Sequence, residues 1–289
     1  MNTQAALTSN VHQPANGRRT EAPATVEALR PPRGQGGRGI YFALRDYLYA
    51  QPELLRTARR LRSMALVGPL QGLITARYRS HNAPLATLHA PFVPTFDPVA
   101  VARGVVEYGY ARVPALAPAL ADRIVSESGR ETIFGAHRRC PTVWALAHDD
   151  RVVGAARHYL GAEPHLFESY VVWTPPERHE YKHTFHYDVA DVRAISLFVY
   201  VTDVDWESGP HQAVAGTHGA KTLADIWTPQ VPDAAVAQRF GDRIDTFIGP
   251  RGTAFFEDQS VVHRALAGAS KLRGTLIVTY TMQRRSPYG

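Results

Sequence analysis

His186 and Asp188 stand two positions apart in a segment whose alternating pattern predicts a β-strand over residues 184–188. Side chains at positions i and i+2 of a strand point the same way, so these two would converge on one point. His263 follows an apolar run much later in the chain and could supply a third ligand from a separate strand. Two histidines and one carboxylate on one face of an octahedral ion leave its other positions open, which is the arrangement that oxygen-activating Fe(II) needs. A structural zinc site would close its coordination shell instead.

Arg273 and Thr275 form a second pair with the same spacing, and Arg273 comes ten positions after His263. On a strand the guanidinium and the hydroxyl would share a face and would suit a carboxylate, which arginine binds through two hydrogen bonds. Residues 276–278 are apolar, and an arginine in such a strand is expected to have an anionic partner. The formal charges of Fe(II), one aspartate, a dicarboxylate and one arginine cancel, so a buried site of this composition carries no net charge. A surface arginine on an edge strand is the alternative interpretation.

The order of several motifs is more specific than any one of them, because a chain with 13 histidines contains short His/Asp pairs by chance. The motifs are Trp173-Thr174-Pro175-Pro176, His183-Thr184-Phe185-His186-Tyr187-Asp188, Ser208-Gly209-Pro210-His211, Gly216-Thr217-His218, His263 and Arg273. Over roughly residues 95–285 this series resembles the phytanoyl-CoA dioxygenase family of Fe(II)/2-oxoglutarate oxygenases.

The resemblance implies a metal site, two cosubstrates and a reaction. Fe(II) would be held by His186, Asp188 and His263, and Arg273, helped by Thr275, would bind the distal carboxylate of 2-oxoglutarate. Dioxygen would be the second cosubstrate, and a C–H bond of a small molecule would be hydroxylated with release of succinate and carbon dioxide. Halogenating relatives lack the metal-binding carboxylate, so Asp188 favours hydroxylation. Desaturation, epoxidation and ring formation stay open, as does the choice among a specialised metabolite, a lipid or sugar precursor and an acyl thioester.

Five residues near these motifs are candidates for the wall of a substrate pocket. They are Trp173, His183, Tyr187, Thr217 and Trp227. The aromatic rings could equally be core or lid packing, and the two polar side chains could equally support neighbouring residues.

The hydrophobic pattern changes from a helical period before residue 161 to a strand period after it. Asp97 and Gly109 bracket one predicted helix, residues 117–128 form a second, and Asp149 and Gly161 bracket a third. Predicted strands cover residues 110–113, 166–173, 184–188, 194–202, 212–215, 246–248, 253–256 and 272–282. This order predicts a mostly β fold with flanking helices (α+β), built on a double-stranded β-helix, or jelly-roll, core.

The chain divides into three parts by composition. Residues 1–38 are rich in Pro, Gly and polar residues and are predicted to be a disordered tail. Residues 39–94 form a basic helical extension, and residues 95–289 form the jelly-roll oxygenase domain, with an insertion at about 219–243. Residues 1–80 hold 12 of the 32 Lys+Arg but only 4 of the 26 Asp+Glu, so the basic charge belongs to the N-terminal region, which includes most of the helical extension. An amphipathic helix predicted at residues 54–65 could touch a membrane surface, but packing on the domain is the preferred interpretation.

Several classes of protein are disfavoured by what the sequence lacks. There is one cysteine, Cys140, so a single chain can hold neither a disulfide nor a Cys-based metal cluster. No apolar run of about 18 residues and no secretory leader are present, so a cytoplasmic protein is expected. No nucleic-acid-binding motif accompanies the basic charge, so a small-molecule substrate and no nucleic-acid partner are expected. The sequence does not define an oligomeric state.

Three rival functions remain open from the residues alone. A non-catalytic β-sandwich module could bind a metal or a sugar through the same residues. A cupin-type dioxygenase or isomerase would use the metal site but would make Arg273 incidental. An oxygenase that acts on RNA or DNA is allowed by the charge asymmetry, although no motif supports it.

Overall fold

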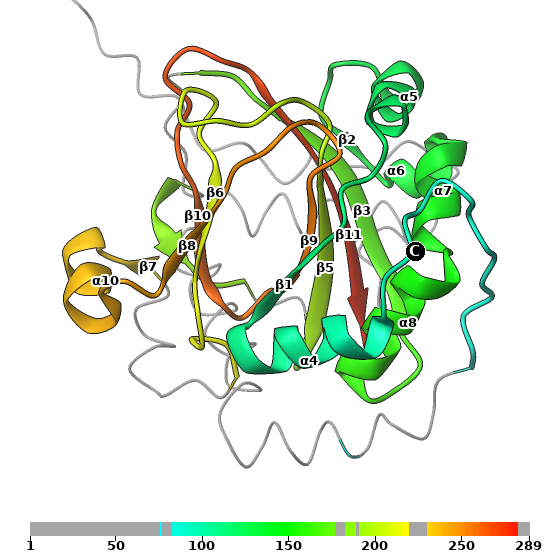
Figure 1. Ribbon diagram of the computed structural model, residues 1–289, viewed down its shortest axis with the longest axis horizontal. Helices are drawn as coiled ribbons and strands as arrows, with labels where there is room; N and C mark the ends of the chain where they lie inside the picture. The colour runs from blue at the N-terminus through cyan, green and yellow to red at the C-terminus, as the bar shows by residue number, and fades with distance from the viewer. Residues whose placement is uncertain (1–75, 77–82, 177–182, 189–190, 220–229, 283–289) are drawn as a thin grey trace, which may run out of the picture. The chain divides into compact units, whose positions relative to one another are not determined.

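The computed structural model describes residues 76, 83–176, 183–188, 191–219 and 230–282, all of which belong to one compact unit, Arg56–Gly289. Two antiparallel β-sheets face each other, and helices cover their outer faces (Figure 1). The predicted tail and the amphipathic helix at residues 54–65 lie outside the described residues. Residues 83–94 of the predicted helical extension contain no helix, and Ala90 and Val93 pack into the main core.

The larger sheet has six strands in the order β1-β9-β5-β11-β3-β2. Their bounds are β1 Tyr110–Val113, β9 Ala254–Asp258, β5 Ala194–Tyr200, β11 Arg273–Thr281, β3 His165–Thr174 and β2 Ile133–Phe134. The central strands β5 and β11 are buried along their whole length, and β5 accordingly reads as a nearly continuous apolar run in the sequence.

The smaller sheet has five strands in the order β7-β4-β10-β6-β8. Their bounds are β7 Gln230–Val231, β4 Phe185–His186, β10 Val262–Ala265, β6 His211–Val214 and β8 Ile244–Phe247. Its outer face carries Phe185, Val214 and Val262, which pack with Val236 of helix α10, Asp233–Phe240. The residues next to these three along the strands therefore point inward, toward the larger sheet.

Five helices, α4 to α8, pack against the outer face of the larger sheet (Figure 1). They are α4 Pro98–Tyr108, α5 Pro118–Ser128, α6 Ala136–Arg139, α7 Pro141–Ala147 and α8 Asp150–Leu160. The predicted caps are confirmed: the Asp97 carboxylate accepts from the backbone N–H of Val99, and Gly109 ends α4 with a left-handed φ of 90°. None of the helices in the described ranges is long and apolar enough to cross a bilayer.

Strand β11 shows how the sheet separates core from cavity. Leu276, Val278 and Tyr280 point outward and join the core beneath the helices. Arg273 and Thr275 alternate with them and face the smaller sheet across a cavity. The predicted common face of Arg273 and Thr275 is therefore confirmed.

The sequence did not predict six of the short elements. Strands β2, β7 and β10 and helices α6, α7 and α10 are additions to the predicted set. Each of these has at most eight residues, too few for a period of 2 or 3.6 to stand out. They form because tertiary neighbours hold them in place; β10, for example, pairs with both β4 and β6.

Candidate active site

The pairing of β4 with β10 brings together the two histidines that are candidate metal ligands. His186 and His263 are direct cross-strand partners, and their ring centroids lie 4.5 Å apart. Asp188 lies just beyond β4, where its backbone N–H donates to the carbonyl of Gln259 at 2.8 Å. Its carboxylate oxygens lie 4.0 Å from Nε2 of His186 and 3.7 Å from Nε2 of His263. One ligand atom from each of the three residues lies within 4.8 Å of the others.

The second nitrogen of each imidazole decides whether these residues could hold a metal. Nδ1 of His186 lies 2.8 Å from the carbonyl of Thr184, and Nδ1 of His263 lies 3.0 Å from the carbonyl of Val261. A carbonyl only accepts, so in both rings Nδ1 carries the proton and Nε2 keeps its lone pair. Both lone pairs then belong to the nitrogens nearest the Asp188 carboxylate, and this donor set fits a divalent ion.

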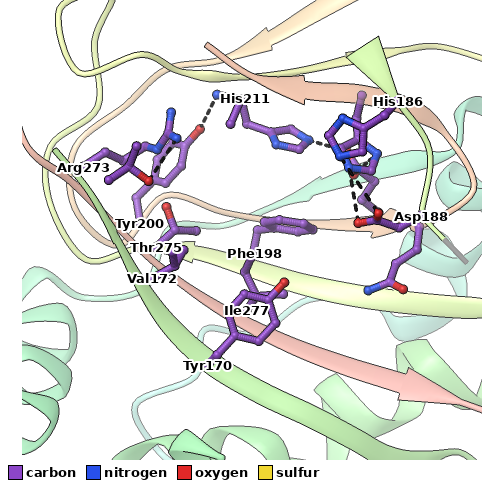
Figure 2. A pocket seen from close by; sticks show the side chains of 15 residues that line it. Tyr170, Val172, His186, Asp188, Phe198, Tyr200, His211, Arg273, Thr275 and Ile277 are labelled. Carbon is purple, nitrogen blue, oxygen red and sulfur yellow. Dashed lines mark hydrogen bonds and ion pairs between the residues drawn. The ribbon is translucent and has the colours of Figure 1, made fainter. Parts of the chain in front are cut away.

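A cavity of about 150 Å³ opens beside the three residues (Figure 2). Its polar side comes from the smaller sheet, from Glu257 on β9 and from Gln259, which directly follows that strand. Its apolar floor comes from the inner face of the larger sheet. The floor residues are Tyr170, Val172, Phe198 and Ile277.

Arg273 lies at the end of the cavity opposite Asp188 (Figure 2). Its side chain is 4% exposed and, among the described residues, donates only to neutral oxygens, the carbonyl of Leu266 at 3.2 Å and the hydroxyl of Thr174 at 3.5 Å. No carboxylate of the described residues pairs with it, and burial lowers the pKa of its guanidinium. Thr275 is buried beside it and also lines the cavity. A buried cation that faces a cavity without an anion suits a carboxylate ligand.

A second polar pair, His211 and Glu257, lines the cavity and was missed by the sequence interpretation. Nε2 of His211 lies 2.7 Å from a carboxylate oxygen of Glu257, and both side chains are buried. The other carboxylate oxygen lies 3.5 Å from Nδ1 of His263. Burial lowers the pKa of His211 to about 3 and raises that of Glu257 to about 8. The only sequence signal was a glutamate placed directly after an apolar strand segment, Thr253–Phe256.

Trp173 does not line the cavity, contrary to the prediction. Its neighbours Val172 and Thr174 face the cavity, so the Trp173 side chain points to the opposite face and joins the core under the helices. A Cβ atom added to Gly274 would lie 2.7 Å from the indole ring, which shows how closely the ring covers that glycine. Tyr187 is buried between two inward-facing residues and is likewise not among the cavity-lining residues.

Thr217 does not line the cavity but supports the sheet through hydrogen bonds. Its hydroxyl donates to the carbonyl of Val214 at 2.7 Å and accepts from the N–H of Val262 at 2.8 Å. It thereby ties the end of β6 to the start of β10, one residue before His263. His183 precedes β4, is half-buried and does not line the cavity, while Trp227 lies outside the described residues.

A second group of residues of metal-ligand type consists of His89, Asp149 and Asp150, none of which lines the cavity. The buried member of this group, Asp149, has a structural role. The Asp149 carboxylate caps α8 and accepts from the N–H of Ala90 at 2.9 Å and from the guanidinium of Arg151 at 2.7 Å. Its oxygens are therefore already satisfied by the fold.

Comparisons with known proteins come from sequence and from structure. No family model matches the sequence. An ectoine dioxygenase of Nocardia farcinica (strain IFM 10152) is 30% identical over 171 residues, which cover 49% of this chain and 56% of the relative. An ectoine dioxygenase of Bordetella parapertussis is 28% identical over 155 residues, which cover 46% of this chain and 50% of the relative. The chain thus spans about half the length of the curated relatives it matches.

A solved structure extends the comparison to most of the chain. The crystal structure of EctD from S. alaskensis with bound Fe matches with a TM-score of 0.51 and 20% identity, over 73% of this chain and 89% of that chain. The two sheets and their covering helices are therefore a fold shared with EctD. The chain is similar to dioxygenases by sequence over about half its length, and to an iron-binding protein by fold.

Proposed function

We propose that this protein is an Fe(II)/2-oxoglutarate-dependent dioxygenase that hydroxylates an unactivated C–H bond of a small molecule. The observation that carries the proposal is that His186, Asp188 and His263 lie at one end of a cavity whose other end holds the buried Arg273, which pairs with no carboxylate of the described residues. Similarity to ectoine dioxygenases over half the chain supports it. We also propose that the two facing sheets form a double-stranded β-helix of the phytanoyl-CoA dioxygenase type.

Each part of the site has a distinct role in this proposal. His186, Asp188 and His263 hold Fe(II), with the imidazole tautomers set by the carbonyls of Thr184 and Val261. The chemistry supplied by bound iron is dioxygen activation coupled to decarboxylation of 2-oxoglutarate to succinate and carbon dioxide.

Arg273 and Thr275 bind the distal carboxylate of 2-oxoglutarate, which supplies the anion that the guanidinium lacks among its described neighbours. Leu266, whose carbonyl accepts from Arg273, lies three residues after His263, a separation of about 10 Å along an extended chain. A short dicarboxylic acid that reaches from the guanidinium toward the metal ligands therefore suits this part of the cavity.

In this proposal the apolar floor of the cavity binds the substrate. The side chains of Val172, Phe198 and Ile277 offer no hydrogen bonds, and in this proposal they keep water out of the part of the cavity that they line. A hydrocarbon part of the substrate would lie on this floor, so that placement near the metal selects the C–H bond that reacts.

The binding test uses the visible absorption that Fe(II) and 2-oxoglutarate develop together in the absence of oxygen. Wild-type protein is expected to show this band only when both are added, and His186→Ala is expected to abolish it. His158→Ala is the matched control, because His158 is an exposed residue of α8 and should leave the band unchanged. A non-catalytic module would give no band with the wild-type protein.

The turnover test is succinate release during a screen of candidate small molecules. Asp188→Ala removes the carboxylate ligand and is expected to abolish substrate-dependent succinate release. Full turnover by this variant would overturn the ligand assignment.

A further inference from the structure

The pair formed by His211 and Glu257 is unusual because it is polar, buried and surrounded by aromatic rings. His211 is 6% exposed and Glu257 is fully buried, and the imidazole lies 5.1–5.7 Å from the rings of Phe198, Phe247 and Phe255. Taking an ionisable pair out of water is unfavourable, and apolar side chains of the same size would fill this core at least as well. Stability alone therefore does not account for the pair.

The sheet register places His211 beside the metal ligands. On the smaller sheet His263 is opposite Ala213, and His211 is opposite Ala265. The two histidines are thus diagonal neighbours on the inner face, and the small alanines leave space for their rings to stack at 5.3 Å with an interplanar angle of 24°. Figure 2 shows His211 between Arg273 and the metal ligands. A ligand that spans the cavity from Arg273 to the metal passes this ring.

The imidazole is held so that one nitrogen remains for a ligand. Nε2 is bonded to Glu257, and the backbone N–H of His211 donates to the hydroxyl of Tyr200 at 3.2 Å. Tyr200 is itself fixed, because its hydroxyl donates to the carbonyl of Phe247 at 2.8 Å. Within the described part of the chain Nδ1 of His211 makes no hydrogen bond, although the residue lines the cavity.

We propose that His211 binds the oxo acid: its Nδ1–H donates a hydrogen bond to the oxo-carboxylate end of 2-oxoglutarate, and Glu257 is the positioning residue that holds the ring in place. The inference rests on the proposed function and extends it to the end of 2-oxoglutarate that Arg273 does not reach. The cavity would then hold this ligand by three anchors, namely the metal, Arg273 and His211.

Three substitutions at one position separate ligand binding from support of the fold. Asparagine places its amide near the position of Nδ1, whereas glutamine reaches the position of Nε2 and can still bond to Glu257. His211→Leu removes both interactions. The readout is the dissociation constant of 2-oxoglutarate with Fe(II)-loaded protein under anaerobic conditions, followed by the visible band, together with the wavelength of that band.

His211→Leu and His211→Gln are expected to weaken 2-oxoglutarate binding by about tenfold or more and to shift the band, whereas His211→Asn should stay within about threefold of wild type. Iron affinity should be the same in all three variants. The opposite order, with Gln like wild type and Asn like Leu, would overturn the inference in favour of a structural role through Glu257. If His211→Leu does not fold, the comparison of His211→Asn with His211→Gln still distinguishes ligand binding by Nδ1 from a structural role through Glu257.

The outcome also separates this inference from the proposed function. A wild-type protein that develops no band with Fe(II) and 2-oxoglutarate would reject both. A normal wild-type band with equal 2-oxoglutarate affinity in all His211 variants would reject the role of His211 and leave the proposed function standing.

Discussion

Replacing Arg273 with methionine should change ligand binding and protein stability in opposite directions. The guanidinium is buried, and its two recorded partners are the neutral oxygens of Leu266 and Thr174, at 3.2 and 3.5 Å. The ligand-free protein therefore holds a cation that no described carboxylate neutralises, and burial lowers its pKa. Methionine has similar length and no charge, so it can fill the space without the desolvation penalty.

Two contributions set the size of the effect on stability. The effective penalty for burying an unpaired ion is several kcal/mol, whereas the two long hydrogen bonds that are lost contribute about 1 kcal/mol each at most. We expect the free energy of unfolding of the ligand-free protein to rise by about 1–3 kcal/mol. Loss of the charged contact to the 2-oxoglutarate carboxylate should weaken binding by about 2–4 kcal/mol, or roughly 30- to 1000-fold.

The assay combines urea unfolding of the metal-free, ligand-free protein with anaerobic titration of 2-oxoglutarate into the Fe(II)-loaded protein. Arg123→Met on α5 is the control, because Arg123 is exposed and should change neither quantity. The reasoning would be refuted if Arg273→Met lowered the free energy of unfolding by more than about 1 kcal/mol while 2-oxoglutarate affinity stayed at the wild-type value.

Two further predictions concern stability. Burial lowers the pKa of His211 to about 3 and that of His263 to about 4, and it raises that of Glu257 to about 8. Between pH 4.5 and 6.5 both imidazoles are protonated in the unfolded chain and neutral in the native protein, whereas the Glu257 carboxyl is protonated only in the native protein. The unfolded state therefore binds one proton more than the native state, so the contribution of these groups to the stability of the metal-free protein rises with pH by about 1.4 kcal/mol per unit. Between pH 6.5 and 8 only the protonation state of Glu257 differs between the native and unfolded states, so the contribution of these groups to stability falls with pH at the same slope. Urea unfolding at several pH values should show that Glu257→Gln removes this decline. An unchanged decline would contradict the assignment of the raised pKa to Glu257. Gly209→Ala should lower the free energy of unfolding by about 2 kcal/mol or more, because φ is +73° and a Cβ would lie 2.2 Å from a backbone oxygen. Gly129→Ala is the control, because Gly129 has the same φ but nothing lies within 4 Å of an added Cβ. In the same urea assay this variant should show only the smaller loss of stability that comes from placing alanine at a positive φ.

Helices α4 and α8 were predictable because their boundaries depend on local chemistry. Asp149 caps α8 through its own side chain, and Gly161 ends it with a left-handed φ of 65°, as the sequence predicted. Asp97 and Gly109 bracket α4 in the same way. Such signals lie within a few residues of the helix they end, so no knowledge of the rest of the fold was needed.

The direction of single side chains was less predictable. Trp173 is a candidate for the pocket wall from sequence because it is aromatic and lies near the ligand motif, with core packing as the alternative, but the cavity-facing positions of β3 are those of Tyr170, Val172 and Thr174. Apolar residues stand on both faces of β3, with Val171 and Trp173 on one face and Tyr170 and Val172 on the other, so the sequence shows no polar face that would indicate which side borders the cavity. The pairing of β3 with β11, which sets Thr174 opposite Arg273, decides this.

The sequence by itself determined which residues share a face: Arg273 with Thr275, and His186 with Asp188, because alternation along a strand is a local property of the backbone. Only the tertiary structure decided that His211 meets Glu257, since the two lie 46 residues apart on strands of different sheets. Neither strand carries information about its partner across the cavity. That contact exists because packing of one sheet on the other buries both side chains, and each then needs a hydrogen-bond partner that only the opposite sheet provides.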